Sequence, residues 1–324
     1  MPIERIIAMS LKFKSNTTPE HFATTILELA NFNLSGPGTI NSTTFSDIVS
    51  QKKSRKMNYK KLITAFAVLF IMFTTVAFAA PYAAIVIDAK TGEVIHEENA
   101  QTRLHPAGFT KLMALYAAYN AVETGLINLD DKVKISKRAS EEPRVSAQLR
   151  NGQIIEFQNL IRATAVKGAN DAATAMGEAV DGSISIFVRR MNGLSTELGL
   201  TRSTWKNPHG LTEKGHLSTA HDIAKLFIAH KRDFPEYFST FARTHTSIGT
   251  REVVNSGRRI LINIPGTKGV KYGYTRAAGY NGAAYVERGG TELVAVVFGG
   301  RSTATLVRQM QLVVDQAFAD ISNK

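Results

Sequence analysis

The hydrophobic period of this chain changes near residue 251, and that change restricts the possible folds more than any other feature. Between about residues 125 and 245, apolar positions recur with helical spacing. From residue 251 onward they alternate in short β-branched runs, which predicts strands. An amphipathic pattern over residues 306–321 predicts a closing helix. The predicted strands cover residues 270–275, 282–287 and 293–298.

A second group of strands is predicted before the helical region. Residues 82–88 are apolar and β-branched, and residues 93–97 return after a turn that contains Gly92, which predicts a hairpin. The two strand groups share one antiparallel sheet only if the two ends of the domain meet. The order of hairpin, helices, strands and helix therefore predicts an α/β (α+β) fold, with a central antiparallel sheet covered by helices and a mostly helical lobe. A site is expected between the sheet edge and that lobe.

Residues 57–79 have the pattern of a secretory signal peptide. A short positive region precedes an almost unbroken apolar run, and Ala77 and Ala79 are the small residues that a signal peptidase inspects. We predict cleavage after Ala79 and a mature domain of residues 80–324. The mature protein is then secreted or periplasmic, with no stable membrane anchor. The alternative is an uncleaved anchor, for which the apolar run is short against a span of about 20 residues.

Residues 1–56 form an unusual leader in front of this signal. A signal peptide normally begins the chain, and Met57 stands where a true start would be. We interpret the leader as a start assigned too early. The alternative is a cytoplasmic tail on an anchored protein.

The composition excludes several kinds of site. The 324 residues include no cysteine, which rules out disulfides, thiolate nucleophiles and cysteine-ligated metals. None of the eight histidines belongs to a tight ligand pair, so we predict neither a metal nor another cofactor. The formal net charge of +12 comes without a nucleic-acid motif, so no nucleic-acid partner is expected. We interpret the charge as a solvated basic surface, with attraction to an anionic polymer or membrane as the alternative.

Three short segments have the residue types of a reactive site. The segment Gly108-Phe-Thr-Lys111 lies at the start of a helix predicted over residues 108–123. The segment Gly168-Ala-Asn170 precedes another helix, and Lys271-Tyr-Gly273 lies on a predicted strand. Residues three apart share one helix face, so a serine at position 108 would lie within reach of the Lys111 amine. Such a pair would be a nucleophile with its base.

In this order the segments resemble the Ser-x-x-Lys, Ser-x-Asn and Lys-Thr-Gly signature of the serine-type D-alanyl-D-alanine carboxypeptidases. This penicillin-recognising family is related to the β-lactamases and transpeptidases, and the resemblance runs from about residue 82 to residue 318. It implies a β-lactamase/transpeptidase-like fold and a serine peptidase of peptidoglycan metabolism. The flanks that support it are His105-Pro-Ala, Lys111-Leu-Met, Asn170-Asp-Ala-Ala, Met191-Asn192, Asn207-Pro-His-Gly-Leu211, Ser218-Thr-Ala220 and Gly273-Tyr-Thr.

The resemblance implies a role for each position of the first two segments. Gly108 stands where the acylated serine should be, and Lys111 where its general base should be. Gly168 replaces the second serine, which relays a proton toward the leaving group. Asn170 keeps the position that orients the substrate amide and the lysine.

The third segment corresponds to the part of the family site that binds the substrate. Lys271 keeps the cationic position that faces the terminal carboxylate, and Gly273 is also kept. Tyr272 replaces the residue whose hydroxyl binds that carboxylate, and we expect its long side chain to fill the groove. Tyr274 follows at a position where the family uses a backbone N–H as an oxyanion donor.

The residues leave three functions open. The favoured one is a catalytically inactive or severely impaired relative that binds the peptidoglycan stem peptide or an envelope protein, because glycine at position 108 offers no nucleophile. Loss of the serine from a serine protease costs about 10⁶ in rate. The second is a working D,D-carboxypeptidase that uses a directed water or an unrecognised nucleophile, of which Thr110 is the nearest hydroxyl. The third is a structural envelope protein without a ligand.

Overall fold

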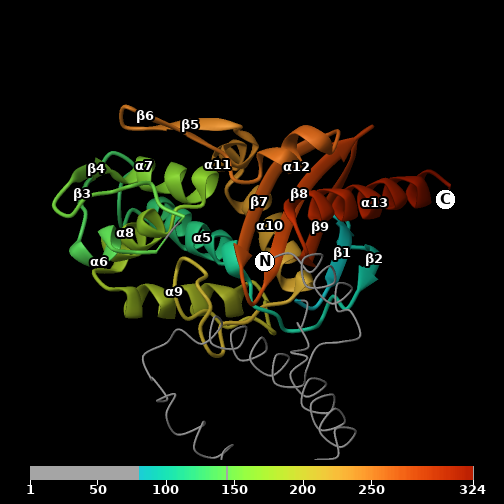
Figure 1. Ribbon diagram of the computed structural model, residues 1–324, viewed down its shortest axis with the longest axis horizontal. Helices are drawn as coiled ribbons and strands as arrows, with labels where there is room; N and C mark the ends of the chain where they lie inside the picture. The colour runs from blue at the N-terminus through green and yellow to red at the C-terminus, as the bar shows by residue number, and fades with distance from the viewer. Residues whose placement is uncertain (1–79, 144, 324) are drawn as a thin grey trace, which may run out of the picture. The chain divides into compact units, whose positions relative to one another are not determined.

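The structure is a computed structural model that describes residues 80–143 and 145–323. The predicted leader and signal peptide lie outside these residues. Five strands form one antiparallel sheet in the order β2-β1-β9-β8-β7. The first and last strand groups therefore do share a sheet, as predicted (Figure 1). The strands are β1 (Ala83–Asp88), β2 (Val94–Glu98), β7 (Thr267–Thr275), β8 (Gly279–Arg288) and β9 (Thr291–Gly300).

The sheet separates two apolar cores because its side chains alternate between the two faces. On one face, Ile85 and Val296 pack with the large core of the helical lobe. On the other face, Val86 and Val297 pack with the core under the last helix. The fold is thus the predicted one, a helix-covered antiparallel sheet with a helical lobe beside it.

The helices before residue 251 and the closing helix lie where the periodicity predicted them, with shifted ends, whereas residues 258–263 form a helix in the region assigned to strands. The helix predicted over residues 108–123 opens as a 3₁₀ turn. Within the region of helical spacing, residues 157–167 divide into an α-helix and a π-helix. The helical elements are η1 (Ala107–Phe109), α5 (Thr110–Glu123), α6 (Lys137–Ser140), α7 (Phe157–Arg162), η2 (Ala163–Lys167), α8 (Asn170–Asp181), α9 (Ile184–Glu197), α10 (Ala220–Asp233), α11 (Pro235–Phe238), η3 (Ser239–Ala242), α12 (Arg258–Asn263) and α13 (Thr303–Ser322).

Two small two-stranded sheets complete the described chain. The strands β3 (Lys132–Lys134) and β4 (Ile154–Glu156) pair within the lobe. The strands β5 (His245–Ile248) and β6 (Arg251–Val254) form a hairpin that leads to α12 and then to β7 (Figure 1). These strands have three or four residues each, so their apolar pattern is too short to stand out in the sequence.

The edge strand β7 positions the candidate site. It ends the sheet on the side that faces the helical lobe, and the start of α5 lies against it (Figure 1). Because β7 pairs only with β8 in this sheet, the backbone on its other side is free to contact η1. The expected site between sheet edge and lobe therefore falls between η1 and β7.

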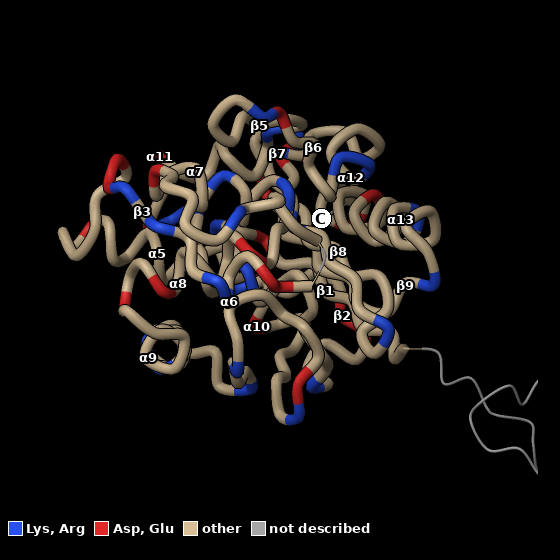
Figure 2. The backbone as a smooth tube through the Cα atoms, turned by 60° about the vertical axis from the view of Figure 1, so that its left-hand side comes forward, with Lys and Arg blue, Asp and Glu red and all other residues tan. Residues whose placement is uncertain are grey.

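In the view of Figure 2, basic and acidic positions are both scattered over the backbone among uncharged residues. In the described part of the chain, no helix combines the length and the apolar character needed to cross a bilayer.

Candidate active site

The structure brings the lysine and the asparagine of the first two segments together, as predicted. Lys111 lies on the first turn of α5, and its Nζ donates a 2.7 Å hydrogen bond to Oδ1 of Asn170, the first residue of α8. A second bond of 2.5 Å runs to the carbonyl oxygen of His209, in the loop between α9 and α10. That second partner was missed from the sequence, since no motif marks a main-chain carbonyl.

Burial makes Lys111 a weak cation. Its side chain is 3% exposed, and burial lowers the pKa of its ammonium group to about 7, against the opposing effect of Asp171 and Glu142. A lysine with such a pKa is partly neutral at neutral pH and could accept a proton.

Lys271 hydrogen-bonds within the protein. Its buried Nζ donates to the carbonyl oxygens of Thr164 and Ala165, at 2.6 and 2.9 Å. These carbonyls belong to the last turn of η2, where a helix has no internal donors left for them. Burial, and secondly the charge of Lys111, hold the pKa of Lys271 well below its usual range. Two of the three donors of Lys271 thus cap a helix end instead of facing an open groove.

Gly108 and Gly273 lie in direct backbone contact. A Cβ placed on Gly108 would lie 2.4 Å from the carbonyl oxygen of Tyr272 and 2.7 Å from Cα of Gly273. A Cβ placed on Gly273 would lie 2.1 Å from the nitrogen of Gly108. Such approaches are far below van der Waals contact, and both partners are backbone atoms that cannot rotate away. The position of the expected nucleophile is therefore packed against the edge strand, with no room for a side chain.

Gly168 ends η2 in the left-handed conformation, with φ of +72°. Glycine adopts this conformation without strain, whereas serine does not. A hydroxyl does lie nearby, because Oγ of Ser256 is 3.6 Å from the place where a Cβ of residue 168 would be. This hydroxyl donates to the carbonyl oxygen of Lys167. Ser256 lies on the turn between β6 and α12, and nothing in its local sequence marked it as part of this region.

Tyr272 does not fill the groove, and that expectation was wrong. Alternation along β7 directs Lys271 toward the lobe and Tyr272 toward the opposite face of the sheet. There Tyr272 packs with the core under α13, and its hydroxyl lies 3.2 Å from Oγ1 of Thr303. Tyr274 lies on this same face, half-exposed, with its ring centroid 4.4 Å from that of Tyr280.

The Thr110 hydroxyl contacts a histidine side chain of the loop between α9 and α10. Its Oγ1 lies 2.8 Å from Nε2 of His216. The Nδ1 of that ring accepts the backbone N–H of Lys206 at 3.3 Å, so the neutral ring carries its proton on Nε2 and donates it to Thr110. Burial lowers the pKa of His216 to about 4, which keeps the ring neutral at neutral pH. His216 therefore cannot take a proton from Thr110.

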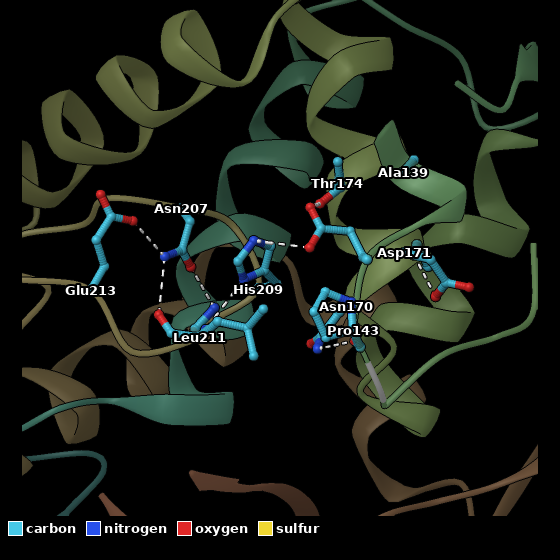
Figure 3. A network of polar contacts seen from close by, with 12 residues as sticks. Ala139, Pro143, Asn170, Asp171, Thr174, Asn207, His209, Leu211 and Glu213 are labelled. Carbon is cyan, nitrogen blue, oxygen red and sulfur yellow. Dashed lines mark hydrogen bonds and ion pairs between the residues drawn. The ribbon is translucent and has the colours of Figure 1, made fainter. Parts of the chain in front are cut away.

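The loop between α9 and α10 covers this region (Figure 3). The His209 ring points toward the segment that holds Asn170, and its Nε2 lies 3.5 Å from a carboxylate oxygen of Glu142. That distance would suit an ion pair. Burial, however, lowers the pKa of His209 to about 3, so the ring is neutral and the contact is not an ion pair. Oδ1 of Asn207 accepts a hydrogen bond from the backbone nitrogen of Gly210 at 2.7 Å, which closes a turn over these residues.

Asp171 holds the preceding loop against α8. Its buried carboxylate accepts hydrogen bonds from Oγ of Ser146 at 2.7 Å and from the backbone nitrogens of Ala147, Leu149 and Ala172 at 2.9, 3.1 and 2.9 Å. Four donors on one carboxylate satisfy both of its oxygens. This loop is thereby fixed beside Asn170.

Replacing Asp171 by asparagine should lower the free energy of unfolding by about 2–4 kcal/mol, because an NH₂ group would face backbone donors and leave one of them unsatisfied. Urea unfolding measures the change. The exposed Asp130, replaced in the same way, serves as the control and should change stability by less than about 0.5 kcal/mol. Equal urea concentrations at the unfolding midpoint for the two variants would contradict the role assigned to Asp171.

Among residues 80–143 and 145–323, no group of three or more histidine and acidic side chains is arranged to hold a metal ion. Trp205 is buried, so it provides no sugar-stacking surface. The site as built consists of two buried lysines, their amide and carbonyl partners, and a closed contact between two glycines.

The fold and the site define the class of protein. Penicillin-binding protein 5 from Haemophilus influenzae superposes with a TM-score of 0.70 and 26% identity, over 73% of this chain and 70% of that chain. Penicillin-binding protein D2 from Listeria monocytogenes, in its cefotaxime-bound form, superposes with a TM-score of 0.66 and 25% identity, over 73% of this chain and 96% of that chain. The architecture is thus that of penicillin-binding proteins, as the resemblance implied.

Sequence relatives identify the family. The profile described as D-alanyl-D-alanine carboxypeptidase matches residues 74–302. The D-alanyl-D-alanine carboxypeptidase DacF of Bacillus subtilis (strain 168) is 34% identical over 241 residues, which are 73% of this chain and 61% of DacF. DacC of Escherichia coli (strain K12) is 30% identical over 256 residues, or 74% of this chain and 64% of DacC. The chain belongs to the D-alanyl-D-alanine carboxypeptidase family, and it spans about three fifths of the length of these relatives.

Proposed function

We propose that this protein is an exported member of the family that acts in peptidoglycan metabolism by binding, without forming an acyl-enzyme. The carrying observation is the contact between Gly108 and β7. The residue at the nucleophile position has no side chain. A side-chain oxygen there would need a Cβ on Gly108, and that Cβ would clash with the backbone of β7 unless the strand moved. Covalent catalysis by this family requires an oxygen there, because the acyl group is transferred to it.

The nearby hydroxyls do not replace the missing serine. Thr110 accepts a hydrogen bond from the neutral ring of His216, which leaves its hydroxyl without a base. Ser256 donates its hydroxyl hydrogen bond to a main-chain carbonyl at a helix end, which cannot act as its base. A water activated by Lys111 is the remaining route to hydrolysis. It is disfavoured because Nζ of Lys111 is buried and already donates to Asn170 and His209.

The ligand that we propose is the peptidoglycan stem peptide or an envelope protein. In its charged form Lys271 has one donor left after it caps η2, and a carboxylate bound there would favour that charged form. Access to it would require η1 and β7 to separate, since their backbones touch at Gly108 and Gly273. Export is proposed from the signal-peptide pattern of residues 57–79.

The test is covalent labelling of the purified mature protein by a fluorescent penicillin, followed by intact-mass spectrometry. We expect the unmodified mass after prolonged incubation. A mass increase of one β-lactam would overturn the proposal and would revive the working carboxypeptidase as the function. Titration with a peptide ending in D-Ala-D-Ala then separates a binding protein from a structural one: a saturable signal that Lys271→Met weakens supports binding at this site. Urea unfolding of the Lys271→Met variant is measured in parallel, because this change removes the hydrogen-bond donor of two carbonyls of η2 and could destabilise the fold.

A further inference from the structure

A hollow outside the candidate active site has two arginines in its wall. Its volume is about 570 Å³, and it lies between the loop that follows β2 and the turn that follows α9. None of its residues belongs to the three segments of the candidate site. Its lining consists of Glu97, Asn99, Ala100, Gln101, Thr102, Arg103 and Arg202.

Each of the two arginines donates a hydrogen bond to the segment that holds the other one. Arg103 reaches across with Nη2 to Oγ1 of Thr204, at 2.9 Å. Arg202 reaches back with Nε to the carbonyl oxygen of Gln101, also at 2.9 Å. Each guanidinium group is thereby fixed through one nitrogen, while its other N–H groups remain available. Neither arginine has a carboxylate within ion-pair distance in the described part of the chain.

The backbone around the two arginines is also fixed. Asn99 adopts a positive φ of 52°, and its side chain donates to the carbonyl oxygen of Tyr82 at 3.2 Å. The backbone nitrogen of Arg202 donates to a carboxylate oxygen of Asp222 at 3.0 Å, and Oγ of Ser203 donates to the same oxygen at 2.8 Å. The nearest buried acid is therefore occupied by the turn itself and does not neutralise a guanidinium group. Both arginines are exposed, and with Glu97 they give the lining a net positive charge that a bound anion would balance.

We propose that this hollow binds an oxyanion, a carboxylate or a phosphate group, that bridges Arg103 and Arg202. Guanidinium groups bind such anions through paired N–H bonds, and a frame that is fixed before binding reduces the entropy lost on binding. Glu97 lies in the same lining and weakens the site, because its negative charge opposes the ligand. This site is separate from the family chemistry and does not depend on the function proposed above.

The test is titration of the mature protein with inorganic phosphate and, separately, with glutarate, at constant ionic strength set with chloride. Isothermal calorimetry measures the affinity. Arg103→Gln and Arg202→Gln should each weaken binding about tenfold, as loss of one charge-assisted bond implies. Arg308→Gln removes the same charge from an exposed position on α13 and should leave the affinity unchanged. Glu97→Gln should strengthen binding severalfold, a gain that misfolding could not imitate.

Three results would overturn the proposal. The first is equal weakening by all three arginine variants, which would indicate only overall electrostatic attraction. The second is the absence of saturable binding of either anion. The third is binding to phosphatidylglycerol vesicles that neither phosphate nor glutarate reduces, which would indicate a membrane surface instead of a site for a single anionic group.

Discussion

Replacing Gly273 by alanine is expected to lower the free energy of unfolding by about 3 kcal/mol or more, at the upper end of what overpacked cores lose. The new Cβ would lie 2.1 Å from the nitrogen and 2.4 Å from Cα of Gly108. Neither atom can rotate away, so β7 and η1 must separate. Phe109 would move with η1, although it is fully buried and packs edge-on against Phe298 at 4.9 Å. In a domain of this size the melting temperature should fall by roughly 10 °C.

Gly193 offers a matched control for this change. It lies in α9 and is exposed, and a Cβ added there would meet no atom within 4 Å. Alanine at position 193 should raise stability by about 0.5–1 kcal/mol, because glycine is unfavourable inside a helix. Unfolding curves of the two variants in urea therefore should move in opposite directions. A Gly273→Ala variant as stable as the original protein would show that η1 and β7 are not in contact.

The same contact bears on any attempt to restore catalysis. The Cβ of a serine at position 108 would lie 2.4 Å from the carbonyl oxygen of Tyr272. The serine could therefore be accommodated only if β7 moved away from η1. A serine at position 168 would be strained by a φ of +72°. We therefore expect Gly108→Ser alone to remain unlabelled by penicillin.

The free energy of unfolding should rise with pH between about pH 7 and pH 9, by up to about 1.4 kcal/mol per pH unit for Lys111. Burial lowers the pKa of Lys111 to about 7, and Lys271 shifts in the same direction. Since an unfolded lysine titrates near pH 10.4, the unfolded chain binds more protons than the folded protein throughout this window. The cost of burying a charged Lys111 therefore lowers the stability fully below pH 7, and this cost decreases as the pH rises.

Tyrosines and histidines change the pH dependence of stability only above and below the range from pH 7 to pH 9. Burial raises the pKa of several tyrosines, including that of Tyr237 to about 12, and their titration opposes the trend only in stronger alkali. Buried histidines act below pH 6.5, where His209 and His216, with pKa values lowered to about 3 and 4, make the folded protein bind fewer protons than the unfolded chain. Their contribution to stability also rises with pH, but in the acid range.

Replacing Lys111 by methionine isolates its share of the pH dependence. The slope of unfolding free energy against pH, measured in urea at several values between pH 7 and pH 9, should become smaller. Lys225→Met, at an exposed position on α10, provides the control and should keep the original slope. If all three proteins have flat and identical profiles, Lys111 is not a buried amine of low pKa.

Much of the fold could be predicted from the sequence. The hairpin of β1 and β2, the strands β7 to β9 and the helix α13 repeat apolar residues over enough positions for their period to be clear. The Lys111–Asn170 contact could also be predicted, because the resemblance to the family carries both residues in order. The short pairs β3–β4 and β5–β6 could not, since three or four residues hold too little periodic information.

The site shows where prediction from the sequence ended. The missing hydroxyls at positions 108 and 168 are plain in the sequence, since the identity of a residue needs no structure. The direction of Tyr272 was predicted wrongly, because replacement of a short hydroxyl residue does not reveal which face of a strand the new side chain takes.

Local sequence was enough to decide which long segments become helix or strand and which functional groups are absent, because periodicity and residue identity are properties of neighbouring residues. Only the tertiary structure decided that Gly108 is closed against Gly273, and that Lys271 caps η2. These contacts join residues more than 100 positions apart. They depend on how η1, η2 and β7 pack around the two cores, and no pattern within one segment specifies that distance.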